Sequence, residues 1–338
     1  MSIEEPKTLT KEEQDKIKHE LEDFEDEFDD AVENEGDIKD GDGNFGVSKE
    51  ELSILRAELA CEFPEDYDYL SDAYILSVAS KPYSKDPTQR RPLDYTMEKL
   101  TNVMQWREES GAPDLIDLIE LANGPASAPA AVEQPQLYTK AKAVASSLNN
   151  GSLYWHGLSK QGKPILWVRT NRKPWYPDVD ADIKALILLT DTGIKGMPKN
   201  TTDFVVIADS TSPPPPNPTF MIEMLKALVR GYPDRLGLLI SSPISSIIQF
   251  VMNLLTPLMP GRLGEKVCLL DGETVMSKLL EVMEEEDIPD FMGGKASHDM
   301  YYPEESKSSI RGSGCLKFDW YGMVQRLEEA RDAYNASH

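Results

Sequence analysis

Cysteine and histidine are both scarce in this sequence. Its 338 residues include only three cysteines and four histidines. The cysteines (Cys61, Cys268 and Cys315) form no CxxC pair, which argues against a zinc ribbon and a disulfide framework. The histidines (His19, His156, His298 and His338) show no metal-ligand spacing, and no GxSxG nucleophile elbow is present. We therefore expect no metal, no cofactor and no enzymatic activity.

Basic charge is also deficient. The chain has 35 Lys and Arg against 59 Asp and Glu, a net charge of −24. Such a balance argues against nucleic-acid binding, which needs a basic surface. The first 50 residues alone hold 19 acidic residues and six lysines. Blocks of like charge are usually solvated, so we expect residues 1–50 to be a disordered acidic segment that could contact a protein partner.

The sequence has no uninterrupted apolar run of membrane-spanning length. Residues 236–261 carry no charge and would be long enough to cross a bilayer. However, Pro243, Pro257 and Pro260 interrupt them, so we interpret them as a strand, a break and a helix over 244–259. The N-terminus, MSIEEPKTLT, also lacks the pattern of a signal peptide. These features predict a soluble, cytoplasmic protein.

The remaining chain divides into segments of different pattern. Residues 51–121 are expected to form a small helical domain, and 122–136 an Ala/Pro-rich linker. Residues 137–298 alternate strands with helices, which predicts an α/β domain with a mostly parallel sheet. Its strands are expected at 164–169, 204–208, 236–241 and 266–270. Its helices are expected at 180–191, 218–230, 244–259 and 273–286. Residues 299–338 form a C-terminal extension with a closing helix at about 319–335.

Three short motifs match known sites only in part. The GDGNFG string at 41–46 follows an acidic run instead of a strand, which disfavours a dinucleotide site. The same segment resembles a calcium-binding EF-hand loop, but Ile38 and Lys49 occupy its first and last ligand positions. The GLSKQGK string at 157–163 resembles a phosphate-binding loop, but Pro164 takes the magnesium-ligand position. We interpret this last string as a turn that leads into strand 164–169.

Five blocks in order are more specific than these motifs. They are LYWHGLSKQGKPILWVRT, FVVIADSTS, RGYPDRLGLLISSP, EKVCLLD and DIPDFMGGK, with the uncharged helix between the third and fourth. Their order and spacing resemble the CRAL-TRIO lipid-binding domain of phosphatidylinositol/phosphatidylcholine transfer proteins. The WREES string resembles an element of that family's helical N-terminal domain, whereas YILSVASKP stands where the family has a basic segment.

The resemblance implies a CRAL-TRIO fold and a lipid-binding or lipid-transfer function without covalent chemistry. One lipid would lie in an apolar pocket under a mobile gate helix, and the protein would contact membranes transiently. Phosphatidylinositol-binding members hold the headgroup with an acidic residue and a lysine that match Asp234 and Lys266. A regulatory protein-interaction scaffold on the same fold, with the acidic N-terminus as its binding arm, is the alternative hypothesis.

The residues themselves also favour a lipid pocket. Helix 244–259 has a broad apolar stripe, and its polar side carries no charge, which is unusual for an exposed helix. We expect its gate residues to be Ile247, Phe250, Val251, Leu254 and Leu255. Ligands of open α/β sheets bind beyond the carboxyl ends of the strands. Further headgroup candidates are therefore Ser210, Thr211 and Ser212, which follow the predicted strand 204–208.

Overall fold

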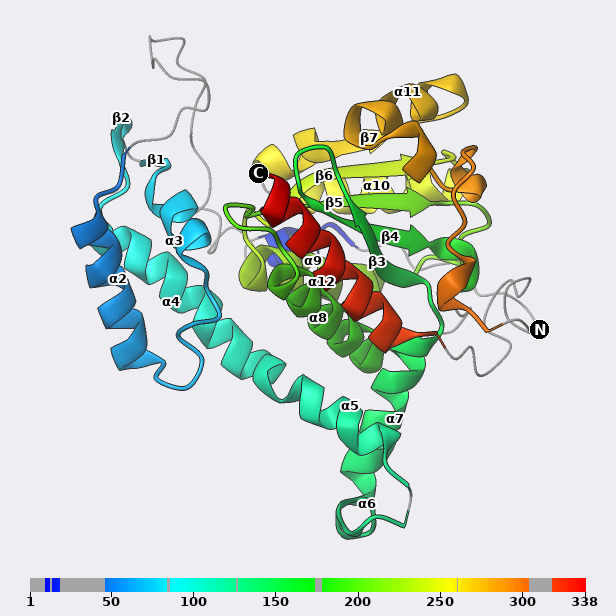
Figure 1. Ribbon diagram of the computed structural model, residues 1–338, viewed down its shortest axis with the longest axis horizontal. Helices are drawn as coiled ribbons and strands as arrows, with labels where there is room; N and C mark the ends of the chain where they lie inside the picture. Colours follow the sequence, from blue (N-terminus) through cyan, green and yellow to red (C-terminus); the bar gives the residue numbers. More distant parts are fainter. Residues whose placement is uncertain are drawn as a thin grey trace.

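The computed structural model describes most of the chain and shows a mixed α/β architecture (Figure 1). The residues described are 10–12, 14–18, 46–83, 86–125, 127–173, 178–259, 261–303 and 318–338. A five-stranded sheet forms the centre, and helices flank it. No helix within these ranges is long and apolar enough to cross a membrane.

A small helical unit precedes the sheet. It contains α2 (Lys49–Glu62), α3 (Asp72–Ala79) and α4 (Leu93–Ser110), with a short antiparallel pair, β1 (Pro82–Tyr83) and β2 (Asp86–Arg90), before α4. A capping box starts α2, because the Ser48 side chain accepts from the Glu51 backbone and the Glu51 carboxylate accepts from Ser48. Gly111 ends α4 in the left-handed conformation that favours glycine. The three helices share their own apolar core, as expected for a helical domain.

The predicted linker is largely helical. After η1 (Ala112–Asp114), the chain forms α5 (Leu115–Asn123), α6 (Pro129–Glu133) and α7 (Pro135–Asn149). Leu115, Ile119 and Ala122 of α5 are buried in the main core together with α7. Packing therefore groups α5 with the sheet-containing part of the chain. Sequence composition missed this because Ala and Pro also suit short helices that begin with proline.

The sheet has strands in the order β3-β4-β5-β6-β7. These are β3 (Leu153–Leu158), β4 (Pro164–Arg169), β5 (Phe204–Asp209), β6 (Leu236–Ser242) and β7 (Val267–Leu269). Strand β3 runs antiparallel to β4, and the other neighbours are parallel. The four expected strands are confirmed, and β5 and β6 are the two that the sequence shows as continuous apolar runs, as buried parallel strands tend to be. Strand β3 was not expected, since Gly157 with φ +73° interrupts its pattern.

The helices of the sheet domain agree with the expected ones in position. They are α8 (Val179–Lys195), α9 (Pro218–Gly231), α10 (Ser246–Leu255) and α11 (Glu273–Val282). The helix expected at 244–259 is shorter than predicted, because η3 (Thr256–Leu258) replaces its last turn where Pro257 stands. Three further short turns, η4 (Gly261–Lys266), η5 (Glu285–Asp287) and η6 (Asp290–Met292), belong to the same region.

The C-terminal extension completes the main core. It contains η7 (Asp299–Tyr301) and α12 (Trp320–Ser337), which lies against β3 (Figure 1). Trp320, Met323 and Leu327 of α12 are buried in the main core. The closing helix expected at 319–335 is thus confirmed. Removing α12 would expose this apolar surface, so the extension is part of the folded unit.

Part of the segment expected to be disordered is helical. Residues 11–12 and 14–18 are helical, and Ile17 packs against a cluster formed by α9, α10 and η3. The dinucleotide-like and calcium-loop strings at 38–51 begin outside the described residues. The phosphate-loop-like string is the β3–β4 turn, as expected: Lys163 forms an ion pair with Asp203 at 2.9 Å instead of opening a helix.

Candidate functional site

Helix α10 carries the five expected gate residues on an incompletely buried apolar surface. Its N-cap is Ser245, whose side chain accepts from the Ile248 backbone, and residues 246–255 carry no charge. Leu254 and Leu255 are buried, and Leu255 packs with η3 against α9. The other three gate residues, Ile247, Phe250 and Val251, are half-buried. The C-terminal end of the helix is therefore packed against the protein, and the residues that precede this end are only partly buried.

Two strands of the sheet, β6 and β7, also retain partly exposed apolar residues. All residues of β5 are buried. In contrast, Leu238 and Leu239 of β6 and every residue of β7 are half-buried. Parallel strands are normally covered on both faces. The β6–β7 half of the sheet thus offers apolar surface that an additional ligand could cover.

Asp234 lies at the amino end of β6 in a turn with a left-handed backbone, φ +60°. The helical N-terminal unit holds this turn in place: the Tyr74 hydroxyl donates to the Pro233 carbonyl at 3.0 Å, and the Arg235 guanidinium stacks 3.6 Å from the Tyr74 ring centre. The partner of the Asp234 carboxylate is Lys81, with which it forms an ion pair. The acidic residue expected to bind a headgroup is therefore already paired with a lysine from another part of the chain.

Two more basic residues influence this pair. Burial by itself would raise the pKa of Asp234, but Lys81, Lys266 and Arg91 outweigh it and hold the pKa of this carboxyl below its usual value. Burial lowers the pKa of Lys81, and Asp234 opposes this effect. Lys266, at the amino end of β7, is near enough for its charge to affect both groups. Asp234 and Lys266 thus lie within electrostatic range of each other, whereas Lys81 is the direct partner of Asp234.

Sequence reasoning did not find Lys81 or Arg91. Lys81 is the lysine of the YILSVASKP string, which was noted only because it lacks the basic residues of the family's segment. The presence of one lysine in this otherwise uncharged string was the sequence feature that could have indicated a role for Lys81. Its pairing with Asp234, far along the chain, could be seen only in the folded structure.

The serine and threonine candidates lie beyond the carboxyl ends of the strands, whereas Asp234 and Lys266 lie at the amino ends. Ser210 follows the carboxyl end of β5 and is buried, with its hydroxyl 2.7 Å from that of Ser241. Thr211 and Ser212 are exposed. At about 3.3 Å per residue, a strand of this length separates its amino end from its carboxyl end by roughly 20 Å. One headgroup could not contact both sets, so the headgroup candidates divide into Asp234 with Lys266 and the Ser210–Ser212 group.

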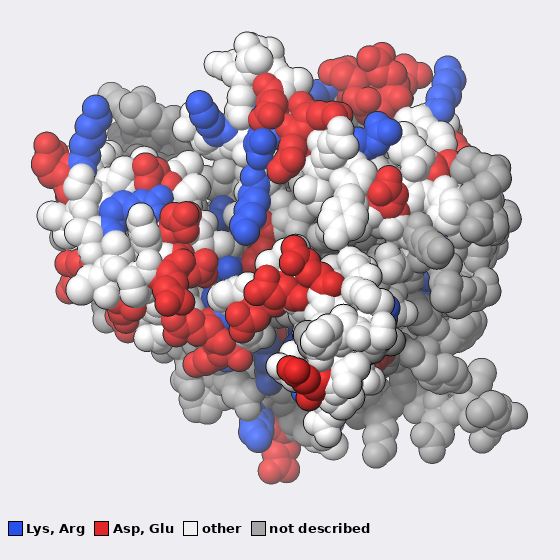
Figure 2. All heavy atoms as spheres, turned by 60° about the horizontal axis from the view of Figure 1, so that its bottom comes forward, with Lys and Arg blue, Asp and Glu red and all other residues white. Residues whose placement is uncertain are grey.

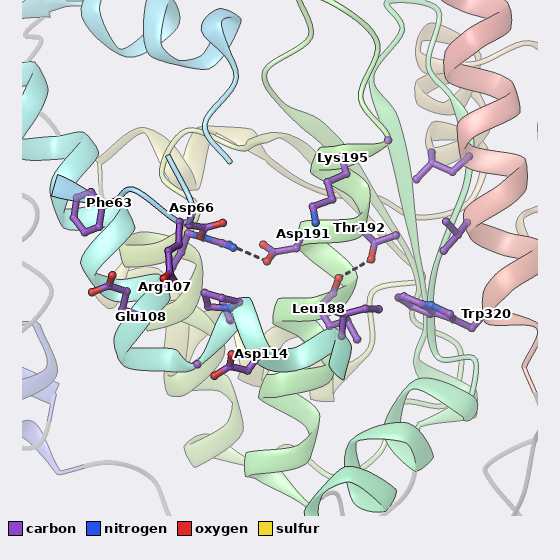
Figure 3. Close-up of a pocket in the computed structure, with 18 of the residues that line it drawn as sticks. Phe63, Asp66, Arg107, Glu108, Asp114, Leu188, Asp191, Thr192, Lys195 and Trp320 are labelled. Atoms are coloured by element: carbon purple, nitrogen blue, oxygen red, sulfur yellow. Dashed lines mark hydrogen bonds and ion pairs between the residues drawn. The ribbon is translucent and has the colours of Figure 1, made fainter. Parts of the chain in front are cut away.

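A separate cavity of about 910 Å³ lies away from both clusters (Figure 3). Its walls come from the α2–α3 loop, the end of α4, η1, α5, α8 and α12, and no residue of α10 lines it. Arg107 of α4 and Asp191 of α8 meet there at 2.8 Å, and Asp66 binds the same guanidinium at 3.0 Å. Burial opposes the charge of Arg107, but Asp191 and its other partners outweigh this and raise its pKa.

Within the described ranges, no group of three or more His, Cys, Asp or Glu could hold a metal ion. His298, which is buried, and His156, which is half-buried, instead pair with tyrosines. His156 Nδ1 is 2.7 Å from the Tyr301 hydroxyl, and His298 Nδ1 is 2.8 Å from the Tyr154 hydroxyl. Burial lowers the pKa of His156 to about 4 and that of His298 to about 2, with nearby positive groups adding to the effect. Both histidines are therefore neutral at neutral pH.

Comparison with known proteins identifies a known domain in part of the chain. The model of the CRAL/TRIO domain matches residues 148–294, which contain β3 to β7 and α8 to α11. No curated protein matches the sequence. Among solved structures, a crystal structure of Sfh5 aligns with 84% of this chain and 100% of its own, with 13% sequence identity and a TM-score of 0.46. The domain match supports binding or transfer of a lipid as the class of function.

Proposed function

We propose that this chain, whose residues 148–294 match the CRAL/TRIO domain, carries a single lipid between membranes without covalent chemistry. The observation that supports the proposal most, besides the domain match, is the half-buried apolar surface of the uncharged helix α10, together with the half-buried residues of β6 and β7. An acyl chain placed there would cover this surface. Each buried methylene contributes about 0.8 kcal/mol.

Apolar burial alone does not select a lipid. A bilayer offers an acyl chain nearly the same gain as an apolar pocket, so the two terms almost cancel during extraction. Selectivity must then come from polar contacts with the headgroup. Helix α10 would open against a membrane surface, to which an uncharged apolar helix can bind, and close again over the lipid.

For the headgroup we propose phosphatidylinositol, bound at the amino ends of β6 and β7. The lysine Lys266 can meet the phosphate, and the Asp234 carboxylate can accept hydrogen bonds from inositol hydroxyls. Lys81 would then exchange part of its contact with Asp234 for the phosphate. The positive charges around Asp234, which lower its pKa, support an anionic ligand at this place.

Transfer of labelled lipids between vesicles tests this proposal. The Lys266→Ala variant is expected to transfer phosphatidylinositol at least about tenfold more slowly, a loss of about 1.4 kcal/mol, and to transfer phosphatidylcholine normally. Lys140→Ala, which removes an exposed lysine on α7, is the matched control and should change neither rate. Equal losses for both lipids, or none for either, would remove Lys266 from the headgroup site.

A further inference from the structure

The cavity beside Arg107 has the size of a ligand site and plays no part in the proposed lipid function. Its volume of about 910 Å³ falls within the range of pockets that hold ligands. It forms where the helical N-terminal unit, α8 and α12 meet, and Figure 3 shows Phe63 and Trp320 at its two ends. Three separate parts of the chain therefore build it.

Apolar side chains line much of this cavity and two remain open to solvent. Leu188, Val324 and Leu327 contribute to the walls. Ile116 is 46% exposed and Tyr321 is 65% exposed, although both are large and line the cavity. Exposed apolar side chains that line a cavity are characteristic of binding grooves. An occupant with apolar side chains would remove it from water.

The charges that line the cavity are mostly negative and unbalanced. Arg107 is bound by Asp66 and Asp191, so it is neutralised within the protein. Four further carboxylates line the cavity and form no ion pair with any residue of the described chain: Glu65, Glu108, Asp114 and Glu328. Lys195 is the remaining basic residue of the lining. Acidic side chains also form a band across the middle of the face shown in Figure 2.

The negative charge of the cavity lining favours cationic occupants over anionic ones. An anionic lipid headgroup would be repelled by the four carboxylates. The protein's own first 50 residues, with 19 acidic residues and six lysines, would be repelled as well. A segment with Lys or Arg beside apolar residues fits both the charge and the apolar walls. We propose that this cavity is a docking site for a basic, partly apolar peptide segment of another protein.

The test uses the full-length protein and a displayed library of random peptides about twelve residues long. Enriched peptides are synthesised, and their affinity is measured by fluorescence anisotropy. The test variant is Glu65→Gln/Glu108→Gln/Glu328→Gln, which keeps side-chain size and removes three charges of the lining. The control variant is Glu58→Gln/Glu273→Gln/Glu286→Gln, which removes three exposed carboxylates outside the cavity.

The enriched peptides are expected to combine Lys or Arg with apolar residues. Their affinity should fall at least about tenfold with the test variant and stay unchanged with the control. Both variants should transfer lipid normally, which separates this site from the lipid function. Peptides that lack basic residues, or that bind both variants alike, would overturn the proposal. The proposal would also be overturned if the protein bound spermine in this cavity and the library gave no enriched peptide, since that result indicates a site for small polycations.

Discussion

At the scale of single residues, His156 and His298 show how burial determines protonation. Their rings lie 4.1 Å apart between centres, and each is held by a tyrosine hydroxyl. Burial depresses the pKa of both below the ordinary value of about 6.5. The unfolded chain therefore binds protons at these two residues before the folded chain does, as the pH falls below about 6.5.

This difference predicts that the protein loses stability in mild acid. Between about pH 6.5 and about pH 4.5, the free energy of unfolding should fall by about 1.4 kcal/mol per pH unit for each histidine. Urea unfolding at several pH values measures this slope. The His156→Gln variant should show a shallower slope, because one of the two titrating groups is gone. An unchanged slope in that variant would contradict the assignment.

The residue scale also shows where prediction from sequence ends. The Asp234 and Lys266 positions could be identified from the strings YPDR and EKV, because the resemblance fixes them within short segments. The ion pair of Arg107 with Asp191 joins residues 84 positions apart, and Lys81 is even farther from Asp234. No local pattern relates such residues, so only folding reveals them.

At the scale of helices and strands, periodicity predicted most elements correctly. Continuous apolar runs identified β5 and β6. Asn217 with Pro218 marked the start of α9, where the Asn217 side chain accepts from the Phe220 backbone. Strand β3 was missed because Gly157 interrupts its pattern, at the place where the pairing with β4 has a register irregularity. The helix α6 was missed because Ala and Pro composition was interpreted as a linker. Local composition is thus least informative where tertiary packing selects the conformation.

Helix α10 gives a prediction about lipid exchange. Phe250 is half-buried, so Phe250→Asp should leave the fold intact and reduce lipid exchange between vesicles by at least about tenfold, since a charge on this surface opposes contact with acyl chains. Leu254 is unsuitable for this test, because it is buried and an aspartate there would destabilise the fold.

The control for this prediction lies on the same helix. Asn253→Asp adds the same charge at an exposed polar position. Its exchange rate should stay near that of the unmodified protein. If a folded Phe250→Asp variant exchanged lipid as fast as the Asn253→Asp control, α10 would not be the gate.

The contact between α4 and α9 gives a prediction about stability. Gly231, the last residue of α9, lies so close to Trp106 of α4 that a Cβ atom would overlap the indole ring. The Gly231→Ala variant should therefore lower the free energy of unfolding by about 1 to 3 kcal/mol. Gly264→Ala is the control, because no atom lies within 4 Å of its Cβ position. Equal stability of the two variants in urea would show that the α4–α9 contact can relax.

At the scale of the whole molecule, the helical N-terminal unit and the sheet domain are joined by buried polar contacts. Tyr69 and Tyr232 both donate to Asp191, at 3.0 and 2.8 Å, and Arg107 binds the other oxygen of the same carboxylate. Lys81 and Tyr74 contact the turn around Asp234. The N-terminal unit thus fixes the turn at which a headgroup is proposed to bind, and also forms one side of the acidic cavity.

Native mass spectrometry of the purified full-length protein tests the central proposal most directly. A lipid carrier should retain one lipid per chain, visible as a mass increase that organic extraction removes and identifies as a phospholipid. Phosphatidylinositol should be enriched over its share of the host membrane. A protein that carries no lipid after gentle purification, and takes none up from vesicles of phosphatidylinositol and phosphatidylcholine, would contradict the proposed function.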